Sequence, residues 1–409
     1  MATSNENYVL LLSAVDSMRN LDVWTPNVGS LATWYAKGRK VSAAFFFDGS
    51  YASAHELTRD GVMLARNHAA GDKAATPFGY YTKTAVEGFA ALPAADYVRG
   101  TYTITKPDDR DWLPDALPSW PKVKAATEPQ LAWTRQALCV RDANPTGASY
   151  MVFLDTTEGG QPTEWQFRSV SEKLGEASKA ADMDKFLADK PGDKPVDARE
   201  IKGDRFTAAG TTGVDLEFFV ANPTDTPRHT IRYGGQVGWL KLPDFRDFLN
   251  LQLPGDGHYL VAVFPHERKE PAPTFARLGD GKVIKVAGSF GTDYVFLSHE
   301  SASAKAERAA FEGTAASVQD RPATGVALTL SAGGSVTYQK YTLASASAAC
   351  LKAEPAALTL VLPADHKGVE VTIAAPGNWS APKGVELKTN DKKQKVLTIP
   401  AGTTTVRLN

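Results

Sequence analysis

The sequence predicts an all-β protein built as an antiparallel β-sandwich of the supersandwich type. Short runs of β-branched and aromatic residues, bounded by Gly, Pro, Asn or Asp, recur throughout the 409 residues. Helix-forming stretches are scarce, and no glycine-rich phosphate-binding motif follows a strand and opens a helix. Short strands separated by turn residues are typical of sandwiches and barrels rather than of alternating βαβ units.

The clearest strand pair spans residues 131–141 and 150–155. Both runs are rich in apolar residues, and Asn144-Pro-Thr-Gly147 supplies turn residues between them. We expect two adjacent strands that end in an acidic turn at Asp155. The apolar side chains of these strands should pack between layers, and the residues concerned are Trp133, Leu138, Val140, Val152 and Leu154.

Similar runs predict the remaining strands. Before the C-terminal region they are Ser30–Tyr35, Val41–Phe47, Gly61–Ala65, Val214–Val220, Tyr259–Phe264, Lys282–Ala287 and Tyr294–Ser298. Two segments rich in Ala, Glu, Lys and Ser predict short surface helices, namely Val170–Leu187 and Ser301–Phe311.

A boundary is predicted near residues 346–356, which separate two strand-rich regions. We assign residues 1–345 to a β-sandwich region and residues 346–409 to a small C-terminal β-module. In the last strands apolar and polar residues alternate cleanly, which indicates half-exposed antiparallel strands. These strands are Leu358–Leu362, Val369–Ile373, Val385–Lys388, Val396–Ile399 and Thr404–Leu408. This region is either an immunoglobulin-like module or the closing sheet of the larger domain.

Composition excludes several classes of function. The formal net charge is −1, with 45 Lys and Arg against 46 Asp and Glu, and no basic cluster indicates nucleic-acid binding. No apolar run reaches the ~20 residues that span a bilayer. Cys139 and Cys350 lack metal-ligand spacing, so we expect two buried free thiols, with a single disulfide as the alternative. We expect no cofactor and no bound metal, since the only local set of ligands is Asp60 with His55 and His68.

Several segments in order carry a resemblance to a family. They are Tyr51–Asp60, Gly61–Asn67, Pro77–Tyr81 and Ala95–Thr103, followed by the strand pair described above. This order resembles the C-terminal β-sandwich of heparinase II/III-like and alginate-lyase-like polysaccharide lyases, and the likeness covers most of residues 28–340. Two features depart from that family. The histidine His55 is offset by one position, and the sequence lacks the helices of the α/α-toroid that carries most catalytic residues of these lyases.

The resemblance implies β-elimination beside a uronic acid, which needs a base, an acid and a partner for the carboxylate. The predicted catalytic residues are His55, His68, Tyr80 and Tyr81, and the predicted substrate-binding residues are Arg66, Lys83, Arg135 and Trp112. The alternative interpretation of residues 51–83 is a polar sandwich edge. A second group with sugar- or anion-binding chemistry comprises Arg228–Tyr233, His258–Tyr259 and His266–Arg268, with a buried strand and a solvated turn as its alternative.

The sequence therefore predicts the β-sandwich part of a heparinase II/III-like polysaccharide lyase, weak or inactive by itself. Its expected partners are an acidic polysaccharide and a toroid domain or chain, and its expected location is extracellular or periplasmic. The alternative is a non-catalytic carbohydrate-binding or cell-surface structural protein that shares only the sandwich.

Overall fold

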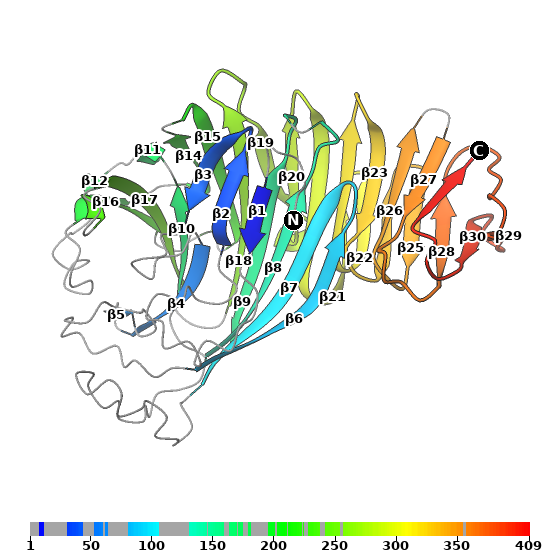
Figure 1. Cartoon of the computed structure of the whole chain (residues 1–409), viewed down its shortest axis with the longest axis horizontal. Coiled ribbons are helices and arrows are strands. Elements are labelled where there is room, and N and C mark those ends of the chain that lie inside the picture. The colour runs from blue at the N-terminus through cyan, green and yellow to red at the C-terminus, as the bar shows by residue number, and fades with distance from the viewer. Residues whose placement is uncertain are drawn as a thin grey trace.

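The protein is all-β, as predicted, and its strands are antiparallel (Figure 1). The computed structural model describes the backbone of these residues: 8–11, 31–43, 53–59, 62–63, 81–105, 131–144, 146–158, 163–169, 171–174, 179–180, 195–200, 203–210, 212–222, 224, 228–237, 242–253, 257–354 and 357–409. Side-chain surroundings are described for a subset: residues 34–39, 41–42, 85–101, 134–144, 146–158, 165, 167, 169, 203–210, 212–222, 224, 258–354 and 357–409. The strands form three sheets, called here the first, middle and third sheets.

The first sheet has 10 strands, and its main order is β1-β2-β4-β10-β17-β16-β13-β12, with β3 beside β2 and β5 beside β4. Its strands are β1 (Tyr8–Leu11), β2 (Leu31–Ala36), β3 (Arg39–Ala43), β4 (Ser53–Arg59), β5 (Val62–Met63), β10 (Thr163–Ser169), β12 (Lys179–Ala180), β13 (Pro195–Glu200), β16 (Arg228–Val237) and β17 (Leu242–Leu253).

The middle sheet has 8 strands in the order β11-β14-β15-β18-β9-β8-β7-β6. They are β6 (Tyr81–Ala91), β7 (Ala95–Thr105), β8 (Leu131–Val140), β9 (Tyr150–Glu158), β11 (Ser171–Leu174), β14 (Arg205–Gly210), β15 (Val214–Asn222) and β18 (Gly257–Glu267). The predicted hairpin is confirmed: Val140 pairs with Tyr150, and in the loop the Gly147 N–H donates to Asn144 O at 2.8 Å.

The third sheet has 13 strands. They are β19 (Thr274–Leu278), β20 (Val283–Gly288), β21 (Gly291–Ala306), β22 (Ala309–Arg321), β23 (Gly325–Leu330), β24 (Gly334–Tyr338), β25 (Tyr341–Ser345), β26 (Ala349–Glu354), β27 (Ala357–Val361), β28 (Val369–Ala374), β29 (Glu386–Thr389), β30 (Lys395–Ile399) and β31 (Thr405–Leu408). Strands on both sides of residue 345 belong to this one sheet, and the division into domains at that residue stays a prediction. A short 3₁₀ turn, Gly279–Gly281, links β19 to β20.

The middle sheet lies between the other two because both of its faces are apolar. On β9, Phe153 packs with Trp165 and Phe167 of the first sheet, whereas the next residue along, Leu154, packs toward the third sheet. Alternate residues of a strand point to opposite faces, so a continuous apolar run on β9 fills two cores at once. The predicted burial of Leu138, Val140, Val152 and Leu154 is confirmed, while the side chain of Trp133 lies outside the described residues.

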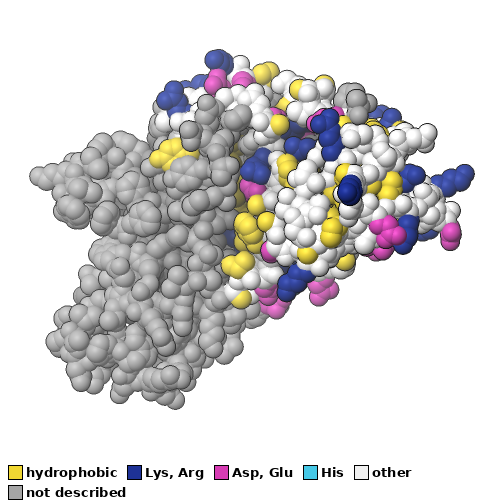
Figure 2. Space-filling model, turned by 45° about the vertical axis from the view of Figure 1, so that its right-hand side comes forward, with side chains coloured by type: hydrophobic (Ala, Val, Ile, Leu, Met, Phe, Trp, Pro, Cys, Tyr) yellow, Lys and Arg dark blue, Asp and Glu magenta, His cyan; other side chains and the backbone are white. Residues whose placement is uncertain are grey.

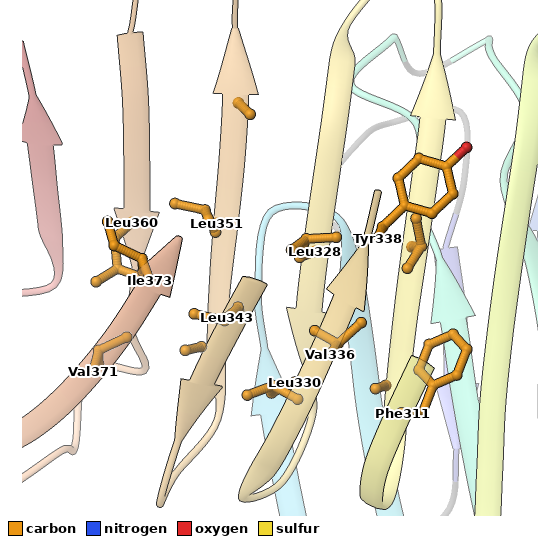
Figure 3. Packing of buried hydrophobic residues seen from close by; sticks show 14 of the residues in the cluster. Phe311, Leu328, Leu330, Val336, Tyr338, Leu343, Leu351, Leu360, Val371 and Ile373 are labelled. Carbon is orange, nitrogen blue, oxygen red and sulfur yellow. The ribbon is translucent and has the colours of Figure 1, made fainter. Parts of the chain in front are cut away.

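A third core lies within the third sheet, which folds over at β22 (Figure 3). The first half of β22 pairs with β24 and the second half with β23, so the two branches face each other across Phe311, Leu328 and Val336. Gly334 permits the fold-over, since its φ is 144° and a Cβ there would lie 2.1 Å from Glu312 O.

The predicted helix at residues 301–311 is wrong. Residues 301–311 belong to the β21–β22 hairpin, with a two-residue turn at Glu307-Arg308 and Ala306 paired with Ala309. The segment alternates buried Ala with exposed polar side chains, and this period of two decides the structure over the helix propensity of Ala. The other predicted helix covers residues 170–187. The parts of it that the structure describes are strands, β11 and β12, and the rest lies outside the described residues.

Two further expectations concern single residues. The acidic turn predicted at Asp155 is wrong: the residue lies within β9, is 0% exposed, and pairs with Arg135 across the sheet. A buried carboxylate is stable there because a guanidinium faces it, which a local sequence pattern does not reveal. Cys139 and Cys350 are both free thiols, as predicted; Cys350 is buried as expected, whereas Cys139 is only half-buried.

Buried ion pairs join the middle and third sheets. Arg321 on β22 is 2% exposed, and its Nη2 lies 2.6 Å from Asp293 Oδ2 while its Nη1 lies 2.5 Å from Asp142 Oδ2. Tyr150 on β9 donates from its hydroxyl to Asp293 Oδ2 at 3.1 Å. These contacts fix the position of β21 over the middle sheet, and β21 carries part of the candidate site.

Candidate functional site

A bulge in β21 places His299 against the middle sheet. The pairing of β21 with β22 shifts register between Leu297 and Ala302. Within this stretch Ser298 O accepts from Gln136 Nε2 and His299 O accepts from Arg99 Nη1, both at 2.8 Å. The bulge leaves carbonyls outside the β21–β22 ladder, and side chains of the middle sheet supply their donors.

Two histidines meet at this end of the middle sheet. His299 Nε2 lies 3.4 Å from Glu158 Oε1, and His258 Nδ1 lies 3.0 Å from Thr156 Oγ1. Partial desolvation of the ring, followed by the electrostatic effect of the neighbouring His299 side chain, lowers the pKa of His258 below its ordinary value of 6.5. His258 is therefore mainly a neutral imidazole at neutral pH, and it is available as a proton acceptor.

The group is accessible and carries both signs of charge. His258 is exposed, and the side chains of His299, Arg99 and Glu158 are 23%, 22% and 64% exposed. Arg99 Nε also lies 3.0 Å from Glu87 Oε2 on β6. We call Arg99, Glu158, His258 and His299 the histidine cluster. Its imidazoles and guanidinium are the groups that recognise a carboxylate or a sulfate.

The structure brings part of the predicted site to the same edge of the sheet. Lys83 lies on β6 in the row Lys83, Thr103, Ala132 and Glu158, which ends at the histidine cluster. Tyr81 lies on the same strand, paired with Thr105. The side chains of both predicted residues, Tyr81 and Lys83, are outside the described residues, so their roles stay predictions.

His55 lies on a strand of the first sheet, and the Arg135 side chain lies between the first and middle sheets. His55 lies on β4 directly opposite Trp165, which is fully buried against the middle sheet. Arg135 is 2% exposed, and its Nη2 lies 2.7 Å from Asp155 Oδ2 with its guanidinium 5.5 Å from the Phe153 ring centre. The Arg135 guanidinium is thus engaged in the interior, and a role in substrate binding stays a prediction. The other predicted residues, Arg66, His68, Tyr80 and Trp112, lie outside the described residues.

The second predicted group, with sugar- or anion-binding chemistry, does not form a single site, because two of its histidines lie far apart. His258 and His266 lie at opposite ends of β18, roughly 26 Å apart given the rise of a strand. Between them Tyr259 is 0% exposed, in agreement with the alternative of a buried strand. Sequence reasoning did not include Arg99, Glu158 or His299 in a site, because they come from three strands far apart in the chain and share no local motif.

No metal centre is found among the residues that the structure describes, where no three His, Cys, Asp or Glu side chains are grouped to hold an ion. The predicted set of Asp60, His55 and His68 lies outside the described side chains. Within the described ranges there is also no helix that is long and apolar enough to cross a lipid bilayer.

Comparison with known proteins shows only a distant structural likeness. No protein-family model matches the chain, and no curated protein matches it. The chain is similar to a crystal structure of heparan sulfate lyase HepC from Pedobacter heparinus, with 13% identity and a TM-score of 0.42 over 71% of this chain. A structure of a mutant of the same lyase gives 13% identity and a TM-score of 0.41. In both comparisons the chain spans 39% of the length of the lyase.

Proposed function

We propose that this protein binds acidic polysaccharide through the histidine cluster, as the β-sandwich part of a heparinase II/III-like polysaccharide lyase. The observation that carries the proposal is the meeting of His258, His299 and Arg99 at one accessible end of the middle sheet. Imidazole and guanidinium donors form charge-assisted hydrogen bonds with carboxylates and sulfates, which a uronic-acid polysaccharide carries on successive sugars.

The cluster offers different chemistry at its two imidazoles. The His299 ring has its Nε2 beside the Glu158 carboxylate, at 3.4 Å from Oε1. His258 has its Nδ1 against Thr156, and its Nε2 has no hydrogen-bond partner among the residues described. In the proposed complex Arg99 and His299 hold the uronate carboxylate, while His258 Nε2 is the group able to accept a proton.

The exposed aromatic residue Phe89 lies on the other face of the middle sheet from the histidine cluster. Phe89 on β6 is 64% exposed and pairs with Val98, which packs toward the first sheet, whereas the next residue, Arg99, points toward β21 of the third sheet. Phe89 is therefore not part of the proposed surface. On the face seen in Figure 2, the described basic and acidic side chains are interspersed without a broad basic area. Anion recognition is thus assigned to a local site rather than to the general field of the protein.

The proposal includes a toroid domain or chain as partner and an extracellular or periplasmic location, where such polysaccharides occur. The second candidate function is a non-catalytic carbohydrate-binding or structural protein. The ion pairs of Arg99 with Glu87 and of His299 with Glu158 favour this alternative, since they occupy the donors that a catalytic site would keep for its substrate.

The binding test uses isothermal titration calorimetry with heparan sulfate, heparin, alginate and hyaluronan. We expect His299→Ala and Arg99→Ala each to weaken binding by about 10-fold or more, the equivalent of one lost hydrogen bond to a charged group. Phe89→Ala should leave binding unchanged, because Phe89 lies on the other face of the middle sheet. The control is Lys269→Ala, which removes an 84% exposed positive charge beyond the opposite end of β18. Equal affinity for wild type and the Arg99 and His299 variants would place binding elsewhere.

Binding should also depend on pH. Because the pKa of His258 is lowered, its ring gains a positive charge only below about pH 6.5, so affinity for an acidic polysaccharide should rise as pH falls through this region. The His258→Ala variant should lose this part of the rise. A pH profile identical in wild type and variant would exclude His258 from the site.

A further inference from the structure

His266 lies in a buried polar network at the end of β18 remote from the histidine cluster. The residue is 5% exposed and Glu217 on β15 is 3% exposed. His266 Nε2 lies 3.3 Å from Glu217 Oε1, and His266 Nδ1 lies 3.0 Å from the backbone oxygen of Glu267. Both ring nitrogens therefore face oxygen atoms.

Glu217 is an acceptor in this network. Thr207 Oγ1 donates to Glu217 Oε1 at 2.8 Å, and Arg205 Nε donates to Glu217 Oε2 at 3.3 Å. Donors directed at both oxygens favour the ionised carboxylate. Burial acts to raise the pKa of Glu217, but the hydrogen bonds from His266 and Thr207 outweigh it and lower the pKa.

These contacts determine the protonation of the His266 ring. A backbone carbonyl and a carboxylate can only accept, so each nitrogen of His266 must carry a proton, and the ring is an imidazolium. His366 shows the opposite pattern in the same chain. Its Nε2 donates to Thr403 O at 2.9 Å, while its Nδ1 accepts from the Gly368 N–H at 3.2 Å, which is the pattern of a neutral ring.

We propose that His266 is a proton switch, charged in the folded protein at neutral pH, which fastens the end of β18 to β15 and releases it when the proton is lost. A neutral ring has one donor only, so a lone pair would face either Glu217 Oε1 or Glu267 O. Such a repulsive contact within a buried network is costly, and the ring must leave its position or the strand ends must separate.

Other charged groups around the network are mostly paired with one another. The described groups that face His266 from each neighbouring element are Arg205 on β14, Asp215 and Glu217 on β15, and Arg268 and Glu270 after β18. Arg268 Nη2 lies 3.1 Å from Asp215 Oδ1, and Lys37 Nζ lies 3.1 Å from Glu270 Oε2. The three carboxylates and three cations named here balance one another, and Glu217 is the carboxylate in direct contact with the His266 ring.

The direction of the pH effect follows from linkage. Burial opposes the charged ring, but the hydrogen bonds to Glu217 and Glu267 raise the pKa of His266 above its ordinary 6.5. A raised pKa in the folded state means that the stabilisation is complete below about pH 6.5 and is lost as pH rises through the folded pKa. The protein should become less stable on the alkaline side of neutrality.

The experiment combines nitrogen-15 NMR of the histidine rings with urea unfolding. In the wild type, His266 should show two protonated ring nitrogens at about pH 6.5 and at neutral pH, while His366 shows one. The urea midpoint of the wild type should fall between about pH 6.5 and pH 9, and the fall should disappear in Glu217→Gln.

Each of the two measurements tests a different part of the proposal and can overturn that part by itself. A single protonated nitrogen on His266 at about pH 6.5 would overturn the proposal from the wild type alone, even if Glu217→Gln does not fold. Identical pH profiles of the urea midpoint in wild type and a folded Glu217→Gln protein would overturn the link to stability. Neither result bears on polysaccharide binding, because the switch and the histidine cluster lie at opposite ends of β18.

Discussion

Replacing Asp293 with Ala is expected to lower the free energy of unfolding by about 3–5 kcal/mol, since it leaves a buried guanidinium without its main partner. Arg321 is 2% exposed. It donates from Nη2 to Asp293 Oδ2 at 2.6 Å and from Nε to Asp293 Oδ1 at 3.2 Å. The Tyr150 hydroxyl loses its acceptor in the same variant. The measurement is the urea midpoint with the slope of the transition, which converts to a free energy for a reversible two-state transition.

Two controls distinguish the loss of a partner from the loss of a side chain. Lys269→Ala removes one member of an exposed ion pair with Glu267, and a loss below about 1 kcal/mol is expected. The double variant Asp293→Ala with Arg321→Met removes both charges and should be more stable than Asp293→Ala alone. A single variant as stable as the wild type would show that Asp142 is a sufficient partner for Arg321.

The 409-residue chain is expected not to depolymerise uronic-acid polysaccharide at a rate typical of a lyase. A positioned acid or base contributes about 10²–10⁴ in rate, and in the family that the sequence resembles these groups lie largely in an α/α-toroid. The histidine cluster offers His258 as one proton acceptor, with Arg99 and His299 already in ion pairs or backbone contacts. Binding without turnover is the expected result.

The assay follows the unsaturated product by its absorbance at about 232 nm with heparin, heparan sulfate, alginate and hyaluronan, because β-elimination creates a conjugated double bond. The wild type is compared with His55→Ala, Tyr80→Phe and His258→Ala, and with Lys269→Ala as the control. Robust turnover that His55→Ala or Tyr80→Phe abolishes would contradict the expectation and make residues 51–83 a catalytic segment. Turnover abolished only by His258→Ala would instead assign catalysis to the histidine cluster.

Local pattern was sufficient for the strands and for one hairpin. The runs around Val140 and Tyr150, with a turn rich in Asn and Gly between them, predicted an antiparallel pair that the structure confirms. The alternation of the last strands predicted antiparallel pairing in the same way, and β27, β28 and β30 follow it. Hydrophobic pattern and strand propensity agreed in these segments, so a short window of sequence was sufficient to predict the strands.

In residues 301–311 the hydrophobic pattern and the helix propensity disagreed. The predicted helix followed the propensity, and it was wrong. Ala-rich composition favours a helix, whereas buried Ala304 and Ala306 alternate with exposed Ser303 and Lys305 as a strand requires. The pairing with β22 and β24, which lies outside any local window, satisfies the backbone hydrogen bonds of the hairpin. Tertiary pairing thus decided the element.

The sequence by itself determined that this protein is all-β and that apolar and polar residues alternate along its last strands. Only the tertiary structure decided the layers and the candidate site. Arg99, Glu158, His258 and His299 meet because β7, β9, β18 and a bulge in β21 converge, and the Asp155 carboxylate is buried because Arg135 stands opposite it. Strand formation depends on neighbouring residues, whereas sheet order, register and bulges depend on partners hundreds of residues away in some cases, as with Arg99 and His299.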